Sequence, residues 1–279
     1  MLAALASGLW SLAAAVPGAA RGSGAPPPRD DAEEAPAESS NGKAAGQLPA
    51  QQRDPAAPDA PATAAAAAPP PLPDAAALAA AIRARRSIFP QHYTPGGAVP
   101  QAALRAMLEA ADWAPSHGRT YPWRFVVLGP KGIQEMQDVT EAVMGRLLAG
   151  APDQLQDVLD ALRRDRARRW APVSHMIAIC MRRQAAPPKL MPEWEEVAAV
   201  ACAVQNMHLT ASARGVACYW SSWHAAARDS PEMGAFLGLA PAAGDRCLGF
   251  LVCGTPAPGA AQAYRAARRP LPGTAEWRE

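Results

Sequence analysis

The sequence predicts one folded domain of the α+β or α/β class, built on a central sheet of four or five strands, within a chain of 279 residues. Two observations predict it. Segments with helical periodicity are intermixed with short apolar runs typical of buried strands. Residues 1–75, in contrast, are mostly Ala, Pro, Gly, Ser, Asp and Glu, with almost no large apolar side chain after Trp10. Such a stretch cannot bury enough apolar surface to offset its ordering entropy, so we expect it to be disordered and assign the fold to residues 76–279.

Residues 1–20 are apolar and small, and Arg21 is the first charged residue. They could form a targeting segment, which leaves import into an organelle open alongside a cytoplasmic location. Gly8 and Pro17 interrupt the run, so no stable membrane anchor is expected.

The first two helices have clear limits. Asp74 can N-cap a helix over residues 75–86, and Pro90 stops it. A second helix opens at Val99 and Pro100, after a Gly-Gly turn. Its apolar residues recur at the i, i+3, i+4, i+7 spacing of one helix face: Leu104, Met107, Leu108 and Ala111.

A strand over residues 125–128 and helices over 131–149 and 152–169 follow, the two helices being separated by a Gly-Ala-Pro turn. Residues 174–181 form a run typical of a buried strand.

The longest helix is predicted over residues 193–214, with Gly215 as its C-cap. It is apolar nearly all round, which indicates burial on several sides, at a domain centre or a subunit interface. A strand over 216–220, a short helix over 231–237 and a continuous apolar strand over 247–253 complete the domain. The tail from Pro256 is expected to be irregular.

Composition and motifs exclude several functions. A net charge of +2 argues against a nucleic-acid-binding surface, and the arginines of residues 163–169 suit a solvated helix face or a lid. The five cysteines, without CxxC, lie in apolar runs and are expected to be buried free thiols. Motifs for dinucleotide folds, P-loops, zinc proteases and serine hydrolases are absent, and no metal site is signalled.

The most informative segment is Ala114-Pro-Ser-His-Gly-Arg-Thr-Tyr-Pro-Trp-Arg-Phe125, a polar loop between a helix and a strand. Arg85-Arg86-Ser87 precedes it by about thirty residues. In order and spacing the two resemble the nitroreductase family of FMN-dependent oxidoreductases, whose usual pattern is an Arg-Ser pair followed by Ala-Pro-Ser-x-x-Asn-x-Gln-Pro-Trp-x-Phe. The resemblance covers roughly residues 80 to 272. It implies an α+β fold with a mostly antiparallel sheet, and a homodimer with FMN at the subunit interface.

The resemblance also implies which residues bind FMN. A phosphate requires Arg forks and hydroxyl donors, and the flavin ring requires an apolar wall and donors near N1, O2, O4 and N5. The implied residues lie in four segments: Arg85, Arg86 and Ser87; Trp113, His117 and Arg119; Trp220, Ser221 and Ser222; and Gly254, Arg268 and Arg269. Taken alone, the first arginines could equally be cations that favour a helix C-terminus.

Three positions depart from the family pattern. Arg119 and Tyr121 replace the usual Asn and Gln, and Phe89 stands where a basic residue is often found. These departures leave the flavin potential and the acceptor open.

We therefore expect an FMN-dependent oxidoreductase that uses NAD(P)H to reduce nitro compounds, quinones or related small acceptors by ping-pong kinetics. No protein group is expected to act as nucleophile or base, because the cofactor performs the hydride chemistry. Alternatives are a protein that stores or senses FMN without turnover, and another flavin reaction on the same scaffold, such as reductive dehalogenation or flavin destruction. The sequence distinguishes neither NADH from NADPH nor one acceptor from another.

Overall fold

The structure is a computed structural model that describes residues 74–184, 190–268 and 274–278. Its four strands form one sheet in the order β1-β2-β4-β3, and every neighbouring pair is antiparallel. The strands are β1 (Trp123–Leu128), β2 (His175–Met181), β3 (Ala217–Ser221) and β4 (Arg246–Gly254). The prediction of an α+β fold with an antiparallel sheet is confirmed. The expected disorder of residues 1–75 concerns residues that, apart from the last two, lie outside the described part of the chain.

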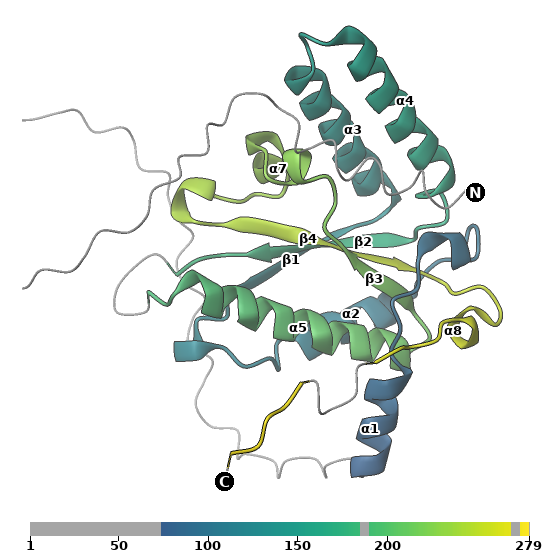
Figure 1. The fold of residues 1–279 in the computed structure, drawn as a ribbon, viewed down its shortest axis with the longest axis vertical. Coiled ribbons are helices and arrows are strands. Elements are labelled where there is room, and N and C mark those ends of the chain that lie inside the picture. Colours follow the sequence, from purple (N-terminus) through teal and green to yellow (C-terminus); the bar gives the residue numbers. More distant parts are fainter. Residues whose placement is uncertain (1–73, 185–189, 269–273, 279) are drawn as a thin grey trace, which may run out of the picture. The chain divides into compact units, whose positions relative to one another are not determined.

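Helices cover both faces of the sheet (Figure 1). On one face lie α3 (Pro130–Leu147), α4 (Pro152–Arg168) and α7 (Pro231–Phe236). On the other lie α2 (Gln101–Ala111) and the long α5 (Glu193–Ala213), with α1 (Ala75–Ala84) beyond them. Two four-residue helices, α6 (Ala225–Arg228) and α8 (Ala260–Ala263), follow β3 and β4.

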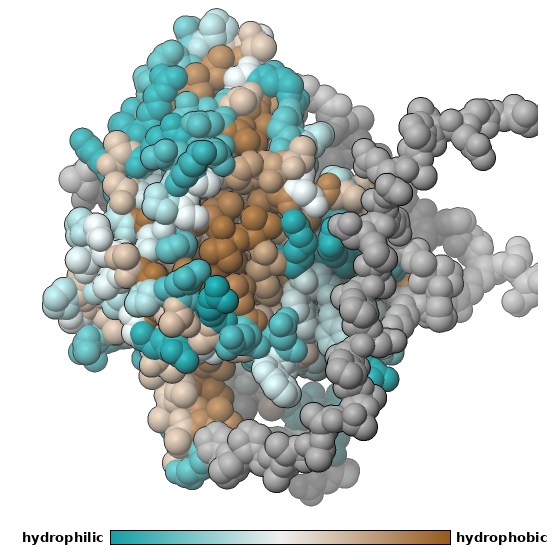
Figure 2. Space-filling model, turned by 180° about the vertical axis from the view of Figure 1, so that it is seen from behind, coloured by the Kyte–Doolittle hydropathy of each residue, from teal (hydrophilic) through white to brown (hydrophobic). Residues whose placement is uncertain are grey.

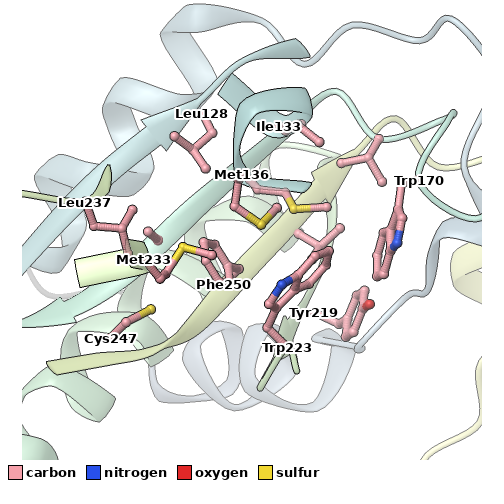
Figure 3. Close-up of a cluster of buried hydrophobic side chains, with 14 of the residues drawn as sticks. Leu128, Ile133, Met136, Trp170, Tyr219, Trp223, Met233, Leu237, Cys247 and Phe250 are labelled. Carbon is pink, nitrogen blue, oxygen red and sulfur yellow. The ribbon is translucent and has the colours of Figure 1, made fainter. Parts of the chain in front are cut away.

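An aromatic and methionine-rich cluster fills the space between the sheet and α3 (Figure 3). Phe250 of β4 and Met136 of α3 are fully buried, and each such side chain contributes about 1.5–3 kcal/mol by leaving water. The Trp223 and Trp170 rings lie 5.1 Å apart, and the Trp223 indole donates to Thr140 Oγ1 at 3.0 Å. The cluster therefore fixes the chain just after β3, next to a segment of the candidate site.

A second cluster packs α2 and α5 against the opposite face of the sheet. Val200, Val204 and Met207 of α5 are buried there, whereas Trp194, in the first turn, is 69% exposed. Gly215 ends the helix with φ +69, and the Val216 N–H donates to the Ala211 carbonyl at 2.8 Å. The predicted C-cap is thus in place, and α5 is covered on only part of its circumference.

The remaining elements mostly agree with prediction, with ends displaced by one or two residues. Asp74 caps α1 by accepting from the Ala76 N–H at 3.2 Å, but the helix stops at Ala84. Two expectations are wrong. The tail is not wholly irregular, because Gly259, at φ +75, starts the short helix α8. Cys202 is exposed rather than buried, because it lies on the face of α5 that neither the sheet nor α2 covers.

The Ala-rich helix α1 has no buried residue, and its Leu78 and Ile82 are each half exposed. It forms an apolar projection at the bottom of the molecule in Figure 2. No helix in the described residues is long and apolar enough to cross a membrane.

Candidate functional site

The segment that contains the predicted Arg85, Arg86 and Ser87 follows α1 and runs beside the edge strand β3. Its position is fixed by backbone bonds: the Ile88 N–H donates to the Cys218 carbonyl at 3.1 Å. The Tyr93 hydroxyl lies 2.9 Å from the Ile88 carbonyl and 3.0 Å from the Val252 carbonyl, and it shares its one proton between these two acceptors. Burial raises the pKa of Tyr93 far above its usual range, so the phenol remains a neutral donor.

The two arginines have different surroundings, although both are half-buried. Arg86 donates through Nε to the Tyr264 carbonyl at 2.9 Å, and through Nη1 to the carbonyls of Arg85 (2.9 Å) and Arg83. Its Nη2 has no bond within the described residues. The Arg85 Nη1 lies 3.5 Å from both ring nitrogens of His208 and makes no other side-chain bond there. Ser87 is half-buried beside them.

His208 is a residue of this site that the sequence analysis missed. It is 7% exposed, and its Nε2 lies 3.0 Å from the Arg86 carbonyl and 3.1 Å from the Cys218 carbonyl. Because carbonyl oxygens can only accept, Nε2 carries a proton in this arrangement, and Arg85 Nη1 lies against the ring at the same distance from both nitrogens. A lone His in the apolar run Met207-His208-Leu209 was the signal that could have pointed to it.

Among the described residues, Arg85 and Arg86 have no carboxylate partner. Other described arginines, such as Arg146 and Arg183, form ion pairs with Glu232 and Glu196, whereas neither Arg85 nor Arg86 pairs with an Asp or Glu in the described part of the chain. Two half-buried cations with no anionic partner in the described part of the chain, followed in the sequence by the Ser87 hydroxyl, make a suitable anion-binding cluster.

The predicted Trp220, Ser221 and Ser222 form the end of β3 and the turn after it. The Ser221 hydroxyl accepts from the Trp223 N–H at 3.3 Å, and the Ser222 carbonyl accepts from Arg228 Nη1 at 3.0 Å. Trp220 is 36% exposed and donates through its indole to the Leu248 carbonyl at 2.9 Å. The turn is thus held by side chains on both sides, which leaves its backbone donors in a fixed orientation.

The structure gives Gly254 a packing role. A Cβ added at Gly254 would meet the Tyr93 ring at 2.2 Å, so glycine allows the chain after β4 to lie against that ring. Arg268 is exposed, and its Nη1 donates to the neighbouring Ala267 carbonyl at 2.9 Å. Arg269 lies outside the described residues.

The predicted loop residues lie elsewhere. His117 Nδ1 lies 2.5 Å from Glu195 Oε2, in the first turn of α5. Their side chains are 65% and 20% exposed, so the pair faces water on one side. Trp113, at the end of α2, is 87% exposed, and Arg119 is exposed as well.

The loop and the arginine segment lie at opposite ends of α5. Glu195, which holds His117, and His208, which contacts Arg85, are thirteen residues apart in this helix, a distance of about 20 Å along its axis. One chain therefore brings Arg85, Arg86 and Ser87 together near β3 and places His117 at the far end of α5, too far away to contact the same phosphate. Trp113 lies one turn after Ala110, whose carbonyl accepts from Asn206 of α5 at 3.1 Å.

Backbone strain is confined to the predicted segments. Three described residues other than glycine have positive φ: Arg119 (φ 53), Tyr121 (φ 45) and Trp223 (φ 57). The left-handed region costs a bulky residue about 1–2 kcal/mol, and such strain is concentrated in proteins at ligand-binding and catalytic sites. Two of the three lie in the loop and one in the turn after β3, which supports a functional reading of both segments.

Comparison with known proteins agrees with this geometry. The family model described as the nitroreductase family matches residues 82–255. No curated protein matches the chain.

Several solved structures are similar. A nitroreductase-like family protein from Bacillus cereus is 26% identical, with a TM-score of 0.52, over 72% of this chain and 96% of that one. A nitroreductase from Bacteroides fragilis with bound FMN is 23% identical, with a TM-score of 0.51, over 72% and 98%. The FMN-dependent nitroreductase NfnB from Mycobacterium smegmatis, in complex with NADPH, is 19% identical, with a TM-score of 0.53, over 74% and 99%. Since the family model spans more than half of the chain and includes both the arginine segment and the polar loop, the chain belongs to the nitroreductase family.

Proposed function

We propose that this protein is an FMN-dependent oxidoreductase that oxidises NAD(P)H and reduces nitro compounds, quinones or related small acceptors. The observation that carries the proposal is the half-buried Arg85–Arg86 pair, which has no carboxylate partner in the described residues and lies beside β3 within the part matched by the family model. A flavin phosphate carries nearly two negative charges, and this cluster offers it Arg85, the free Nη2 of Arg86 and the Ser87 hydroxyl.

The residues around this cluster suit the rest of the cofactor. The turn after β3 holds the backbone N–H of Ser222 in a fixed orientation, suited to charge near N5 and O4. FMN supplies hydride acceptance at N5 and electron transfer to the acceptor, so the protein only has to bind, orient and exclude water. The relatives crystallised with FMN and with NADPH support the same choice of cofactor and reductant.

We further propose that the active form is a homodimer in which each site combines the arginine segment of one subunit with the polar loop of the other. The two segments lie at opposite ends of α5, and a two-fold axis across the middle of that helix would bring unlike ends together. Four exposed apolar residues of α1, the end of α2 and the start of α5 suit such an interface: Leu78, Ile82, Trp113 and Trp194.

The visible spectrum of the purified full-length protein, before and after NADPH is added, tests the function. We expect the absorption of oxidised flavin, its bleaching by NADPH without oxygen, and its return when a nitroaromatic or quinone is added. A yellow protein that NADPH and NADH both fail to bleach would instead indicate storage or sensing of FMN, and a colourless one that cannot be loaded with FMN would contradict the cofactor.

Subunit complementation tests the shared site. An Arg85→Ala chain and a His117→Ala chain, each impaired alone, should recover activity when they are unfolded and refolded together. Half of the random dimers are then heterodimers with one intact site, so about a quarter of all sites should be wild type. If Arg85 and His117 served the same site within one chain, mixing would restore nothing.

A further inference from the structure

Four of the five cysteines form two cross-strand pairs in the sheet. Cys218 of β3 lies opposite Cys253 of β4, and Cys180 of β2 lies opposite Cys247 of β4. The two pairs face opposite sides of the sheet, since Cys218 and Cys253 belong to the core cluster under α5 and the other two to the cluster under α3. Nothing in the proposed flavin chemistry uses any of these thiols.

The backbone around Cys218 and Cys253 has the geometry of a disulfide-forming pair. The Cys253 carbonyl accepts from the Ser174 N–H at 3.0 Å, on the β2 side, and the Cys218 carbonyl accepts from the Ile88 N–H at 3.1 Å, on the outer side. The backbone polar groups of the two residues therefore point away from each other, which makes this a non-hydrogen-bonded pair. In such pairs the Cα atoms are about 4.5 Å apart and the side chains are closest, which falls within the range that a disulfide bridges.

The groups around Cys218 favour reaction at its sulfur. A hydrogen bond from the Cys253 thiol lowers the pKa of Cys218, and His208 and Arg85 lower it further, although burial acts in the opposite direction. The pKa of Cys253 is raised, by its bond to Cys218 and by burial. The pKa shifts of the two thiols thus run in opposite directions, as they also do for Cys247 and Cys180, and they suit Cys218 to the role of attacking cysteine and Cys253 to that of resolving cysteine.

We propose that Cys218 and Cys253 are a redox-active dithiol that hydrogen peroxide converts to a cross-strand disulfide. The Cys218 sulfur attacks one peroxide oxygen, the O–O bond breaks, and the products are a sulfenic acid on Cys218 and one water. The Cys253 sulfur then attacks the Cys218 sulfur, the S–O bond breaks, and the hydroxyl leaves as a second water with the Cys253 proton. Two thiols lose two electrons and two protons, and one peroxide is reduced to two waters.

Position in the sheet separates this pair from the other one. Cys218 is only 1% exposed, but it lies on β3, an edge strand of the sheet in the described residues, whose outer side is bonded at this point by the Ile88 N–H alone among backbone donors. A small uncharged oxidant would therefore reach Cys218 when this edge opens locally. Cys180 and Cys247 lie on β2 and β4, which have a strand on each side, and the register shifts between Ile179 and Cys180. The second pair is therefore a matched control within the same sheet.

The test counts thiols in the full-length protein, in a Cys202→Ser background that removes the exposed thiol and its intermolecular links. The protein is treated with hydrogen peroxide, quenched with catalase, denatured, alkylated with N-ethylmaleimide and mapped by peptide mass spectrometry. We expect the loss of two of its four thiols, a Cys218–Cys253 linked peptide, and full recovery after dithiothreitol. Adding Cys247→Ser should leave this link intact, whereas Cys218→Ser should abolish it.

The Cys218→Ser chain could lose the link simply by misfolding, so a second variant retains only Cys218 and Cys253. Peroxide should oxidise both thiols of this variant. The bridge closes a loop of about 36 residues, which should raise the melting temperature by several degrees over the reduced protein. Four intact thiols after treatment, irreversible oxidation of Cys218 without a link, or a link between Cys180 and Cys247 would each overturn the proposal. None of these readouts depends on flavin binding or turnover.

Discussion

At the scale of single residues, Arg85 and Arg86 stand side by side in the sequence, but their environments differ. Arg86 ties three backbone carbonyls together through Nε and Nη1, whereas Arg85 contacts only the His208 ring within the described residues. Arg86 therefore combines a ligand-binding surface with a structural role, and Arg85 is the better probe of phosphate binding.

Replacing Arg85 by Ala should remove a charge-assisted bond worth about 1.5–3 kcal/mol and weaken FMN binding by roughly 10- to 150-fold, with little change in the melting temperature. Arg86→Ala should weaken binding and also lower the melting temperature of the apoprotein. FMN binding is measured by quenching of flavin fluorescence. Riboflavin, which lacks the phosphate, should bind wild type and Arg85→Ala alike. Equal losses of both ligands would mean that Arg85 shapes the ring pocket instead.

His224, beside the Trp223 ring, makes stability depend on pH. Burial lowers the pKa of His224 from its usual 6.5, with a further lowering from Arg169 and an opposing effect of Asp165. Burial also lowers the pKa of His175. The folded state thus favours neutral rings, so their contribution is complete above pH 6.5 and is lost as the pH falls through the folded-state values.

Melting temperatures measured from pH 7.5 down to pH 5 should therefore fall, and His224→Gln should flatten part of that decline while His175 maintains the remainder. If the melting temperature of His224→Gln falls with pH as steeply as that of the wild type, groups other than His224 cause the loss of stability in acid.

At the scale of elements, α1 is the first helix of the described residues. Asp74 caps the helix, and the preceding residues have the composition of a chain that contributes no core. Deletion of residues 1–73 should leave flavin content and melting temperature nearly unchanged, as measured by absorbance and calorimetry. Deletion of residues 1–84, which removes α1 as well, should lower both. Flavin loss from the shorter deletion would place the extension inside the fold.

The elements that could be predicted from the sequence are those whose burial leaves a periodic pattern. The face of α2 and the continuous apolar run of β4 are examples, since both pack on the sheet. The helices α6 and α8 are too short to carry a period, and helix ends depend on local caps.

The candidate site was less predictable. Its four segments could be named from motifs, but the left-handed Arg119, Tyr121 and Trp223 could not, because their local preference opposes that conformation. His208 lies next to Arg85 only because of the tertiary fold, which no local motif indicates. The cysteine pairs depend on strand register, which shifts between Ile179 and Cys180.

At the scale of the whole molecule, we propose that one flavin face serves both substrates in turn. The sequence contains no dinucleotide-binding motif of the GxGxxG type, and in this proposal NAD(P)H and the acceptor occupy the same place successively. Initial-rate measurements should give parallel lines in double-reciprocal plots, typical of ping-pong kinetics. Intersecting lines would indicate a ternary complex and a second binding position.

Because about 20 Å of α5 separates His208 from Glu195, the proposed shared site also makes FMN retention depend on protein concentration. If each flavin pocket is formed by two subunits, a separated subunit makes only part of the contacts with FMN and binds it more weakly. Flavin retention then becomes a function of protein concentration by mass action: dilution releases FMN, and added FMN draws subunits back together. FMN would then stabilise the dimer in addition to taking part in the reaction.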